Sequence, residues 1–372
     1  MAGMSTPAAL SADPLPLLRL ALAPGPREPR RRLLESLPRQ LPGPDTRLPV
    51  VPTPVLDRCL AWLAQPGHHF LAWNDPRYPP LLRQCTDAPL GLFVAGDPDH
   101  LWQPMLALVG SRGASAGGRD NARAFAAAFC RAGVGVASGL AAGIDGAAHQ
   151  AALDAGGLTV AVLGTGPDRP YPRHHGALME RVAAHGAVVS EHPPGTPPRA
   201  IHFPARNRII AGLSLGTVVV EAALRSGALI TARVAAEYGR EVFALPGSIH
   251  HPQARGCHRL IRDGAQLVEG PAEVLAGIAP LAGRLARDLD PGPATTGAAP
   301  EPGNAASAPS SDHDILWHAI GHDPTPMDVL AERTGLTPAT LSSMLLAMEL
   351  DGRIAVEHGR YARRSTGGGA VA

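Results

Sequence analysis

The chain has 372 residues, enough for two or three domains, and its charge is nearly balanced, with 33 basic and 32 acidic residues. Any nucleic-acid site must therefore be a local patch, because the chain as a whole carries no strong net charge. All the basic residues are arginines. Without lysine, a Walker A loop, a Schiff base and a lysine general base are excluded, and phosphate contacts must come from guanidinium and backbone N–H groups.

Cysteine and histidine usage argues against a metal site. The four cysteines are scattered without a CxxC pair, so neither a disulfide framework nor a cysteine zinc site is indicated. The pairs His174-His175 and His250-His251 lie in turn-like contexts and no HExxH motif occurs, so we expect no metal and no cofactor. The chain starts without a signal peptide and has no apolar run of membrane-spanning length, so we expect a cytoplasmic protein with no membrane contact.

Composition divides the chain into segments. Residues 1–69 are rich in proline and arginine, and their short apolar stretches predict a small N-terminal helical (SAM-like) region. Residues 70–279 form the main domain. Residues 280–312 are dominated by proline, glycine, alanine and serine and cannot bury a core, so they read as a flexible linker. A compact unit follows at 313–364, and we expect residues 365–372 to be a disordered tail.

Between residues 105 and 270, short apolar runs alternate with alanine-rich helical stretches. The runs predict strands at Met105–Gly110, Val134–Gly139, Thr159–Gly164, Ala187–Glu191, Gly216–Ala222 and Glu241–Gly247. The stretches between them predict helices at Gly118–Ala132, Ile144–Ala155, Ala177–His185, Pro204–Leu213 and Ala228–Tyr238. This alternation predicts an α/β fold with a parallel, doubly wound sheet and helices on both faces.

The segment at 313–364 predicts three helices and a short hairpin, which make a winged helix. The third helix begins at Thr337, a good N-cap, with Pro338 at its first position. From Thr337 to Leu350 there is no arginine or lysine. A winged helix that reads DNA needs cations on this helix, so we expect this one to contact protein instead.

Glycine clusters follow three of the predicted strands, where ligands bind in a doubly wound sheet. They are Gly110–Gly113, Ser138–Asp145 and Leu163–Pro172. Each opens toward a helix N-terminus, which suits an anion such as phosphate. Leu101–Arg119 contains no acidic residue and places Arg112 at the mouth of the expected crevice. The alternative is that these glycines only make tight turns; neither GxGxxG nor GxxxxGK is present.

A second arginine patch lies on the lead-in to the helix at Pro204–Leu213. From His192 to Val220 there is no Asp or Glu. Arg206 and Arg208 suit phosphate oxygens, and Phe203 offers a flat face to a base. This patch could face Arg112 across the crevice. The alternative is a helix start with solvated arginines and a core phenylalanine.

The carboxylates nearest the crevice are Asp145, Asp168 and Glu221, and Asp145 can serve simply as a helix cap. The spacing suggests no Ser-His-Asp arrangement, and GxSxG is absent. The sequence thus favours binding over catalysis, and we expect no enzyme and no catalytic residue.

Several ordered motifs closely resemble the DNA-processing protein A (DprA/Smf) family over about Phe70 to Leu275. These motifs are Val109–Arg112, Ser138–His149, Ala161–Gly166 with Tyr171-Pro172, His202–Gly212, Glu221–Ala232, Pro246–Ser248 and Arg255–Gly264. The resemblance implies an extended Rossmann-like domain that binds single-stranded DNA without sequence preference, usually as a homodimer. It also implies a role in natural transformation and recombination, in which RecA recombinase is loaded onto incoming strands.

Carried over to this chain, the resemblance implies that the loop Gly110-Ser111-Arg112 holds phosphates and that Phe203 contacts a base. The full nucleic-acid-binding set would be Gly110, Ser111, Arg112, Gly139, Arg173, His202, Phe203, Arg206, Asn207 and Arg208. The chain departs from the family where Ala142 replaces a frequent arginine, where the Tyr-Gly after the first loop is missing, and where His174-His175 replaces an acidic-asparagine pair.

Two other functions compete with this interpretation. Gly216-Thr217 followed by Glu221 is similar to the phosphoribohydrolases of the lysine-decarboxylase-like family, which release a base from nucleoside monophosphates. That family keeps its glutamate closer to the Gly-Thr and adds a glycine pair, which Ser214-Leu215 does not supply. The other alternative is an interaction scaffold in which the winged helix and the linker carry the function.

Overall fold

A computed structural model describes residues 14–36, 50–289, 316, 319–320, 324–350, 353–357 and 360–363. The chain divides into two compact units, with the boundary in the sequence between Gly283 and Arg284. Each unit has its own hydrophobic core. The predicted tail at 365–372 and most of the predicted linker lie outside the described residues.

The first unit is built on a nine-stranded sheet with the strand order β1-β2-β6-β5-β4-β3-β7-β8-β9. The strands are β1 (His68–Ala72), β2 (Gly91–Gly96), β3 (Met105–Val109), β4 (Gly135–Ser138), β5 (Thr159–Leu163), β6 (Ala187–Ser190), β7 (Gly216–Val219), β8 (Glu241–Ala244) and β9 (Gln266–Leu267). All six strands predicted between residues 105 and 270 are confirmed. From β6 to β9 every pairing is parallel, but β2 pairs antiparallel with β6 and β1 antiparallel with β2. The sheet is therefore mixed, because β2 runs antiparallel to both of its neighbours near one edge.

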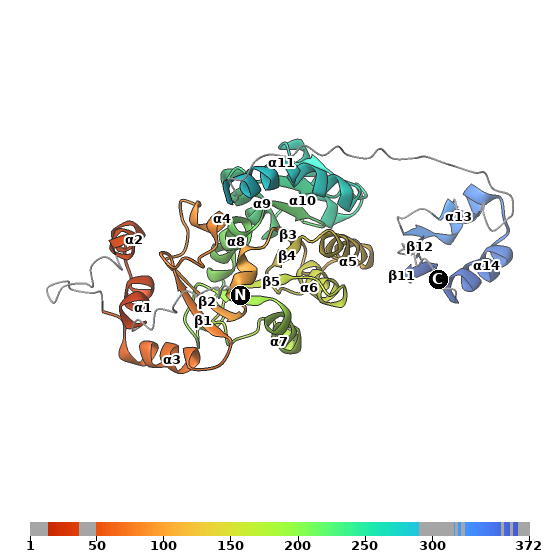
Figure 1. Ribbon diagram of the computed structural model, residues 1–372. Helices are drawn as coiled ribbons and strands as arrows, with labels where there is room; N and C mark the ends of the chain where they lie inside the picture. Colours follow the sequence, from red (N-terminus) through yellow and green to blue (C-terminus); the bar gives the residue numbers. More distant parts are fainter. Residues whose placement is uncertain are drawn as a thin grey trace, which may run out of the picture. The chain divides into compact units, whose positions relative to one another are not determined.

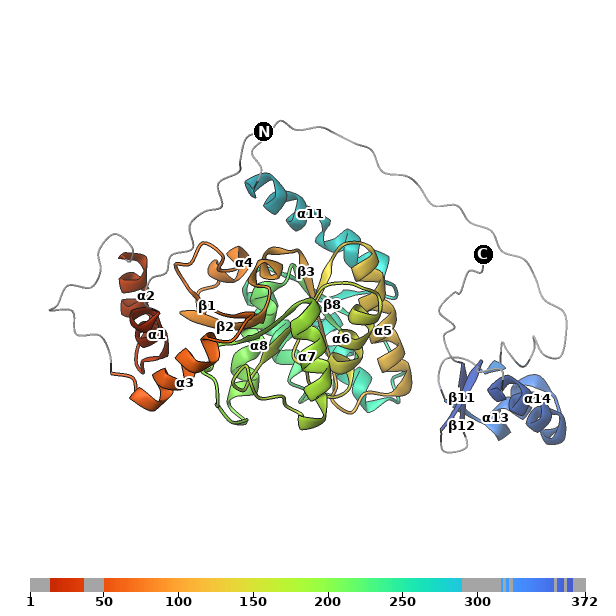
Figure 2. The same ribbon diagram turned by 60° about the horizontal axis from the view of Figure 1, so that its bottom comes forward.

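Helices cover both faces of this sheet, as predicted. On one face lie α5 (Ala116–Arg131), α6 (Ile144–Asp154) and α7 (Gly176–His185), and on the other lie α8 (His202–Leu213) and α9 (Ala228–Glu237) (Figures 1 and 2). The strand order reverses beside β3, since the chain moves from β3 outward to β6, then returns to place β7 on the other side of β3. This is the topological switch point of a doubly wound sheet, where ligands bind.

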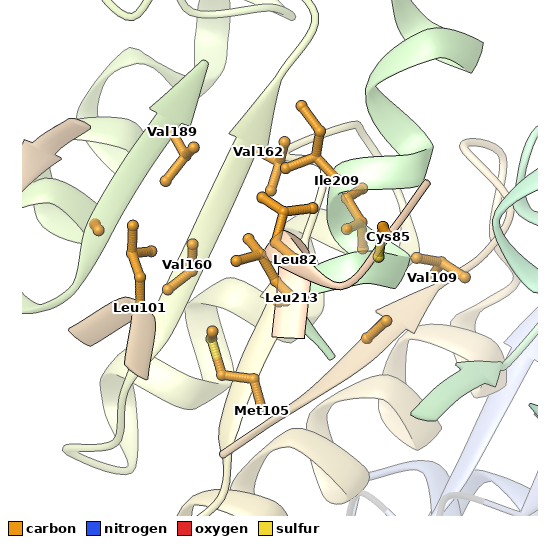
Figure 3. Packing of buried hydrophobic residues seen from close by; sticks show 14 of the residues in the cluster. Leu82, Cys85, Leu101, Met105, Val109, Val160, Val162, Val189, Ile209 and Leu213 are labelled. Atoms are coloured by element: carbon orange, nitrogen blue, oxygen red, sulfur yellow. The ribbon is translucent and has the colours of Figure 1, made fainter. Parts of the chain in front are cut away.

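The core forms because side chains alternate across the buried strands. On β5, Val160 and Val162 join the cluster that packs under α8, while Ala161 and Leu163 join a second cluster on the other face. Figure 3 shows Ile209 of α8 beside Val162 within the first cluster. The short helix α4 (Pro80–Arg83) packs on α8. The central strands β3, β4, β5, β6 and β7 are therefore buried on both faces, which explains their continuous apolar sequences.

The described part of residues 1–69 contains the helices α1 (Leu15–Leu22), α2 (Arg27–Ser36) and α3 (Thr53–Leu63). The Arg30 guanidinium ties α2 to the end of α1 by donating to the carbonyls of Ala23 at 2.5 Å and Gly25 at 2.8 Å. The similarity of this region to a SAM-like domain stays a prediction. Strand β1 begins at His68, so the sheet starts slightly before the expected boundary at residue 70.

Near the end of the first unit lie α10 (Arg255–Arg262) and α11 (Pro271–Leu289). Helix α11 continues past residue 280, where the linker was expected to begin. The apolar periodicity of residues 271–289 outweighs Pro280, which lies inside the helix.

The second unit contains α13 (Met327–Thr334), α14 (Pro338–Leu350) and a three-stranded sheet ordered β10-β12-β11. Strands β11 (Ile354–Glu357) and β12 (Arg360–Arg363) form the predicted hairpin, and β10 (Thr325–Pro326) adds a third strand that the sequence did not indicate. Thr337 Oγ1 accepts a hydrogen bond from the Thr340 amide at 3.3 Å, as expected of an N-cap. Leu341 and Leu345 are buried in this unit's core.

Candidate functional site

A cavity of about 710 Å³ opens at the switch point, beyond the carboxyl ends of β3 and β7. The loop after β3, the start of α8 and the turn after β7 supply most of its lining. A cavity in this position follows directly from the topology, because the loops after β3 and β7 leave the sheet next to each other but lead to opposite faces.

Arg112 and Phe203, predicted from separate stretches of sequence, meet in this cavity. The guanidinium carbon of Arg112 lies 5.4 Å from the centre of the Phe203 ring, a cation–π contact. Tyr171 adds a second aromatic ring, tilted by 41° and centred 4.9 Å from that of Phe203. Arg112 is exposed, and within the described part of the chain its guanidinium has no hydrogen bond or ion pair. The site thus offers an available cation beside two aromatic faces.

The loop that carries Arg112 is hydrogen-bonded to the loop after β4. The Ser111 carbonyl accepts a hydrogen bond from the Ile144 amide at 3.2 Å. Gly143 has a φ of +81°, and a Cβ there would lie 2.2 Å from the Ser111 carbonyl oxygen, so only glycine permits this approach. Gly110, Ser111 and Arg112 all line the cavity, where the sequence placed them.

Arg206 makes hydrogen bonds inside the protein that the sequence did not indicate. Its side chain is buried, with Nη1 donating to the carbonyls of Gly139 (2.6 Å) and Val162 and Nε donating to Asn207 Oδ1 at 3.0 Å. Burial lowers the pKa of Arg206 to about 10, although the nearby Asp145 carboxylate acts in the opposite direction. Arg206 lines the cavity, as expected, but Nη1 and Nε hold three segments of the protein together. Its contact with a phosphate stays a prediction.

Gly139 is also an internal residue. A Cβ at this position would lie 2.0 Å from Nη2 of Arg206, so glycine makes room for that side chain. The Gly139 amide donates to the Asp145 carboxylate at 3.1 Å instead of pointing to a ligand, and Gly139 does not line the cavity.

Arg208 lies outside the cavity, contrary to expectation. Its guanidinium Nη2 contacts both Glu191 oxygens at 2.6 Å, and Nε lies 3.5 Å from Asp87. The side chain is only 8% exposed. Two acids that are distant in sequence, Glu191 and Asp87, thus neutralise this arginine, although its neighbours along the chain include no acidic residue.

Asn207 lines the cavity, but its polar atoms are engaged within the protein. Its Oδ1 accepts from Arg206, and its Nδ2 donates to the Gly227 carbonyl at 3.1 Å. It therefore fixes the turn after β7 against α8.

His202 and Arg173 flank the cavity without lining it. The ring of His202 stacks on that of His192 with 4.0 Å between centres, and its Nδ1 lies 3.1 Å from the Gly164 carbonyl. Burial, together with the neighbouring His202, lowers the pKa of His192 to about 4, so His192 adds little positive charge at neutral pH. Arg173 lies in the 3-10 turn η2 (Arg173–His175) and is exposed.

Of the three carboxylates highlighted in the sequence, only Asp145 lines the cavity. It is buried and accepts from the Gly139 and Ala141 amides at 3.1 and 3.4 Å. Burial raises the pKa of Asp145, and Arg206 opposes that effect. Glu221 accepts from both the amide and the hydroxyl of Ser115 at the start of α5, and Asp168 accepts from the Gly195 amide. None of these carboxylates is arranged as a free catalytic group.

Among the lining residues that the sequence did not single out, Tyr171 and Arg225 carry an aromatic ring and a positive charge. Tyr171 was recognised only as part of a motif. Arg225 follows Glu221 and so lies outside the stretch without acidic residues, although the Glu221 carboxylate is hydrogen-bonded to Ser115 at the start of α5. The position of Arg225 directly after a strand of the sheet was the available signal.

Two further findings concern the described residues only. No three His, Cys, Asp or Glu side chains among them come together as a metal site would require. None of their helices combines the length and the apolar character needed to cross a membrane.

The sequence of residues 69–279 matches the family described as DNA recombination-mediator protein A, and residues 299–360 match the DprA winged helix domain. The chain is 44% identical over 319 residues to Protein Smf of Escherichia coli, covering 84% of this chain and 82% of that protein. It is 48% identical over 202 residues to the DNA processing protein DprA of Streptococcus pneumoniae, covering 54% of this chain and 71% of that protein.

Solved structures agree with these matches. The X-ray structure of DprA from Streptococcus pneumoniae superposes with a TM-score of 0.55 at 45% identity, covering 57% of this chain and 74% of that one. A structure of DNA processing protein A from Helicobacter pylori, described by its single-stranded DNA binding mode, gives a TM-score of 0.50 at 26% identity and covers 59% of this chain and 96% of that one. With two family domains matched in order and the expected extended Rossmann-like and winged-helix folds present, this chain belongs to the DprA/Smf family of DNA recombination-mediator proteins.

Proposed function

We propose that this protein binds single-stranded DNA without sequence preference through the cavity at the switch point. The observation that carries the proposal is the unpaired Arg112 guanidinium beside the Phe203 and Tyr171 rings. A cation next to flat apolar faces suits a strand whose phosphates are charged and whose bases are unstacked. The Helicobacter pylori relative, described as binding single-stranded DNA, supports the same conclusion.

The geometry favours a single strand over a duplex. A base can stack on Phe203 only if its own face is free, and duplex DNA hides the faces of its bases in the helical stack. Gly110 and Ser111 let a phosphate approach the backbone closely, next to Arg112. Phosphate contacts and stacking are both independent of base identity, so no sequence preference is expected.

Fluorescence anisotropy with labelled single-stranded and duplex oligonucleotides tests this proposal. Binding should be tighter to the single strand and should weaken steeply with salt. Phe203→Ala should cost about 1–3 kcal/mol of binding free energy, the usual value of one stacked base. Arg112→Ala should flatten the salt dependence, with log K falling by about 0.7 less per unit of log salt.

Arg233→Ala is the matched control. Arg233 lies on α9 with an exposed side chain and does not line the cavity, so its removal should leave binding unchanged. Equal affinity for duplex and single strand, or no effect of Arg112→Ala, would show that the site is wrong.

The remaining predicted contacts, Arg173 and His202, are proposed to touch DNA outside the cavity. We also retain homodimer formation, the loading of RecA onto the bound strand and a role in DNA uptake during natural transformation as proposals. They imply a cytoplasmic location and no enzymatic turnover. Light scattering tests the dimer, and RecA-dependent strand exchange with and without this protein tests loading.

The phosphoribohydrolase alternative is not favoured. Glu221, the carboxylate on which it depends, caps α5 and does not line the cavity. Release of free base from nucleoside monophosphates would restore it.

A further inference from the structure

The turn after β7, residues 223–227, forms the wall of the cavity on the other side of the switch point from Arg112. Strands β3 and β7 are neighbours in the sheet, so the loops that follow them start side by side. Arg112 follows β3 and Arg225 follows β7. The topology therefore brings together two arginines that are more than a hundred residues apart in sequence.

The turn that carries Arg225 is fixed at both ends. The Gly227 carbonyl accepts from Asn207 Nδ2 at 3.1 Å, and the Ser226 amide donates to the Ala223 carbonyl at 2.9 Å. At its start, the Ala222 amide donates to the Gln253 carbonyl at 2.7 Å. The backbone below Arg225 is thus held in place before any ligand arrives.

The guanidinium of Arg225 itself is free. Arg225 is exposed, and across the described ranges it makes no hydrogen bond or ion pair. Leu224 beside it is 49% exposed, so the turn presents a cation and an apolar side chain together. A long cationic side chain on a rigid turn at a cavity edge is suited to an anionic ligand.

The surroundings of the charged residues in the cavity lining show which of them are available to an anionic ligand. The lining contains the arginines Arg112, Arg206 and Arg225, with Asp145 as its acid. Asp145 is buried, and its electrostatic interaction with the buried Arg206 is stronger than its interaction with Arg112. Arg112 and Arg225 are exposed, and neither guanidinium makes an ion pair within the described residues.

We infer that Arg225 is a second phosphate-binding residue, and that one DNA strand crosses the cavity with one phosphate at Arg112 and another at Arg225. This inference rests on the proposed binding of single-stranded DNA. It assigns to the turn after β7 a contact with the phosphodiester backbone. The strand would pass over Phe203, which lines the same cavity.

The salt dependence of binding tests this inference on the full-length protein. For a single strand, each phosphate contact contributes about 0.7 to the slope of log K against log salt. Arg225→Ala should lower the magnitude of the slope by about 0.7, and the double variant with Arg112→Ala by about 1.4. Arg225→Lys should restore the slope because lysine keeps the charge, whereas Arg233→Ala should leave it at the wild-type value.

The outcomes separate this inference from the proposed function. If the wild-type protein does not bind single-stranded oligonucleotides, the proposed function fails. If the wild type binds, and Arg112→Ala lowers the slope but Arg225→Ala does not, only the second phosphate contact is overturned. A slope that Arg225→Lys fails to restore would also overturn it. Thermal melting of each variant establishes that the exposed substitution leaves the fold intact.

Discussion

At the scale of single residues, the arginines of the site separate into two kinds according to their surroundings. Arg206 is 6% exposed and its Nη1 and Nε donate to carbonyl and amide oxygens, while Arg112 is exposed and its guanidinium lies over the Phe203 ring. Both arginines lie in stretches of sequence that contain no acidic residue, so their neighbours along the chain do not distinguish them. Burial and hydrogen bonding decide which arginine supports the fold and which one is available to DNA.

Substitution of Arg206 should reduce stability far more than substitution of Arg112. Removing the Arg206 side chain leaves the carbonyls of Gly139 and Val162 and the Asn207 amide oxygen without their donor, at a cost of about 1–3 kcal/mol for each buried group left unsatisfied. Arg112→Ala removes no ion pair and should change the free energy of unfolding by less than about 0.5 kcal/mol. Urea denaturation of the two variants measures the difference. A stable Arg206→Ala protein that no longer binds DNA would contradict the structural role and restore Arg206 as a ligand.

At the scale of elements, the start of α5 is coupled to the end of β7. Ser115 caps α5 by accepting from the Gly118 amide at 2.9 Å, and the Glu221 carboxylate accepts from the Ser115 amide at 2.9 Å. A carboxylate near a helix N-terminus also interacts favourably with the helix dipole. Hydrogen bonds therefore connect the segments on either side of the switch point.

Glu221→Ala should destabilise the protein without removing its DNA contacts. Leaving the Ser115 donors without an acceptor costs about 1–3 kcal/mol, and urea denaturation should show this loss. The slope of log K against log salt should stay at the wild-type value, since Glu221 does not line the cavity. Glu221→Gln keeps an acceptor oxygen and should lose less stability than Glu221→Ala. A changed salt slope in both variants would place Glu221 in the binding site.

At the scale of the whole molecule, the two units have separate cores. The core of the second unit is formed by its own residues, including Leu330, Leu341 and Ile354. The cavity and every residue assigned to DNA lie in the first unit. The second unit is therefore not needed to build the site.

A chain that ends at Leu289 should keep its affinity for single-stranded DNA. This end point preserves α11, which a cut at the predicted linker boundary would divide. Affinity should stay within about threefold of the full-length value, a change of less than about 0.7 kcal/mol. Anisotropy measurements on both chains provide the comparison. Complete loss of binding would instead favour the scaffold hypothesis, in which the winged helix and the linker carry the function.

The sequence predicted much of the fold because each buried strand is a short apolar run and each covering helix is a longer alanine-rich stretch. It did not predict β1, β9 or β10. His68-His69-Phe70 is not an apolar run, and Thr325-Pro326 is too short to carry a period, so both become strands only through pairing with a neighbour. The sequence also did not indicate the antiparallel edge of the sheet, because the direction of β2 is set by its pairing with β6, which is distant along the chain.

The sequence by itself determined the alternation of strands and helices along residues 105–270, the family, and the presence of Arg112 and Phe203 in one site. These follow from local patterns and motifs. Only the tertiary structure decided that Arg206 and Arg208 are internal and that Arg225 lines the cavity. Asp145, which interacts with Arg206, and Glu191, which pairs with Arg208, lie outside the helix that carries these arginines. The availability of a charge depends on burial and on partners brought together by folding, and neither is a local property of the chain.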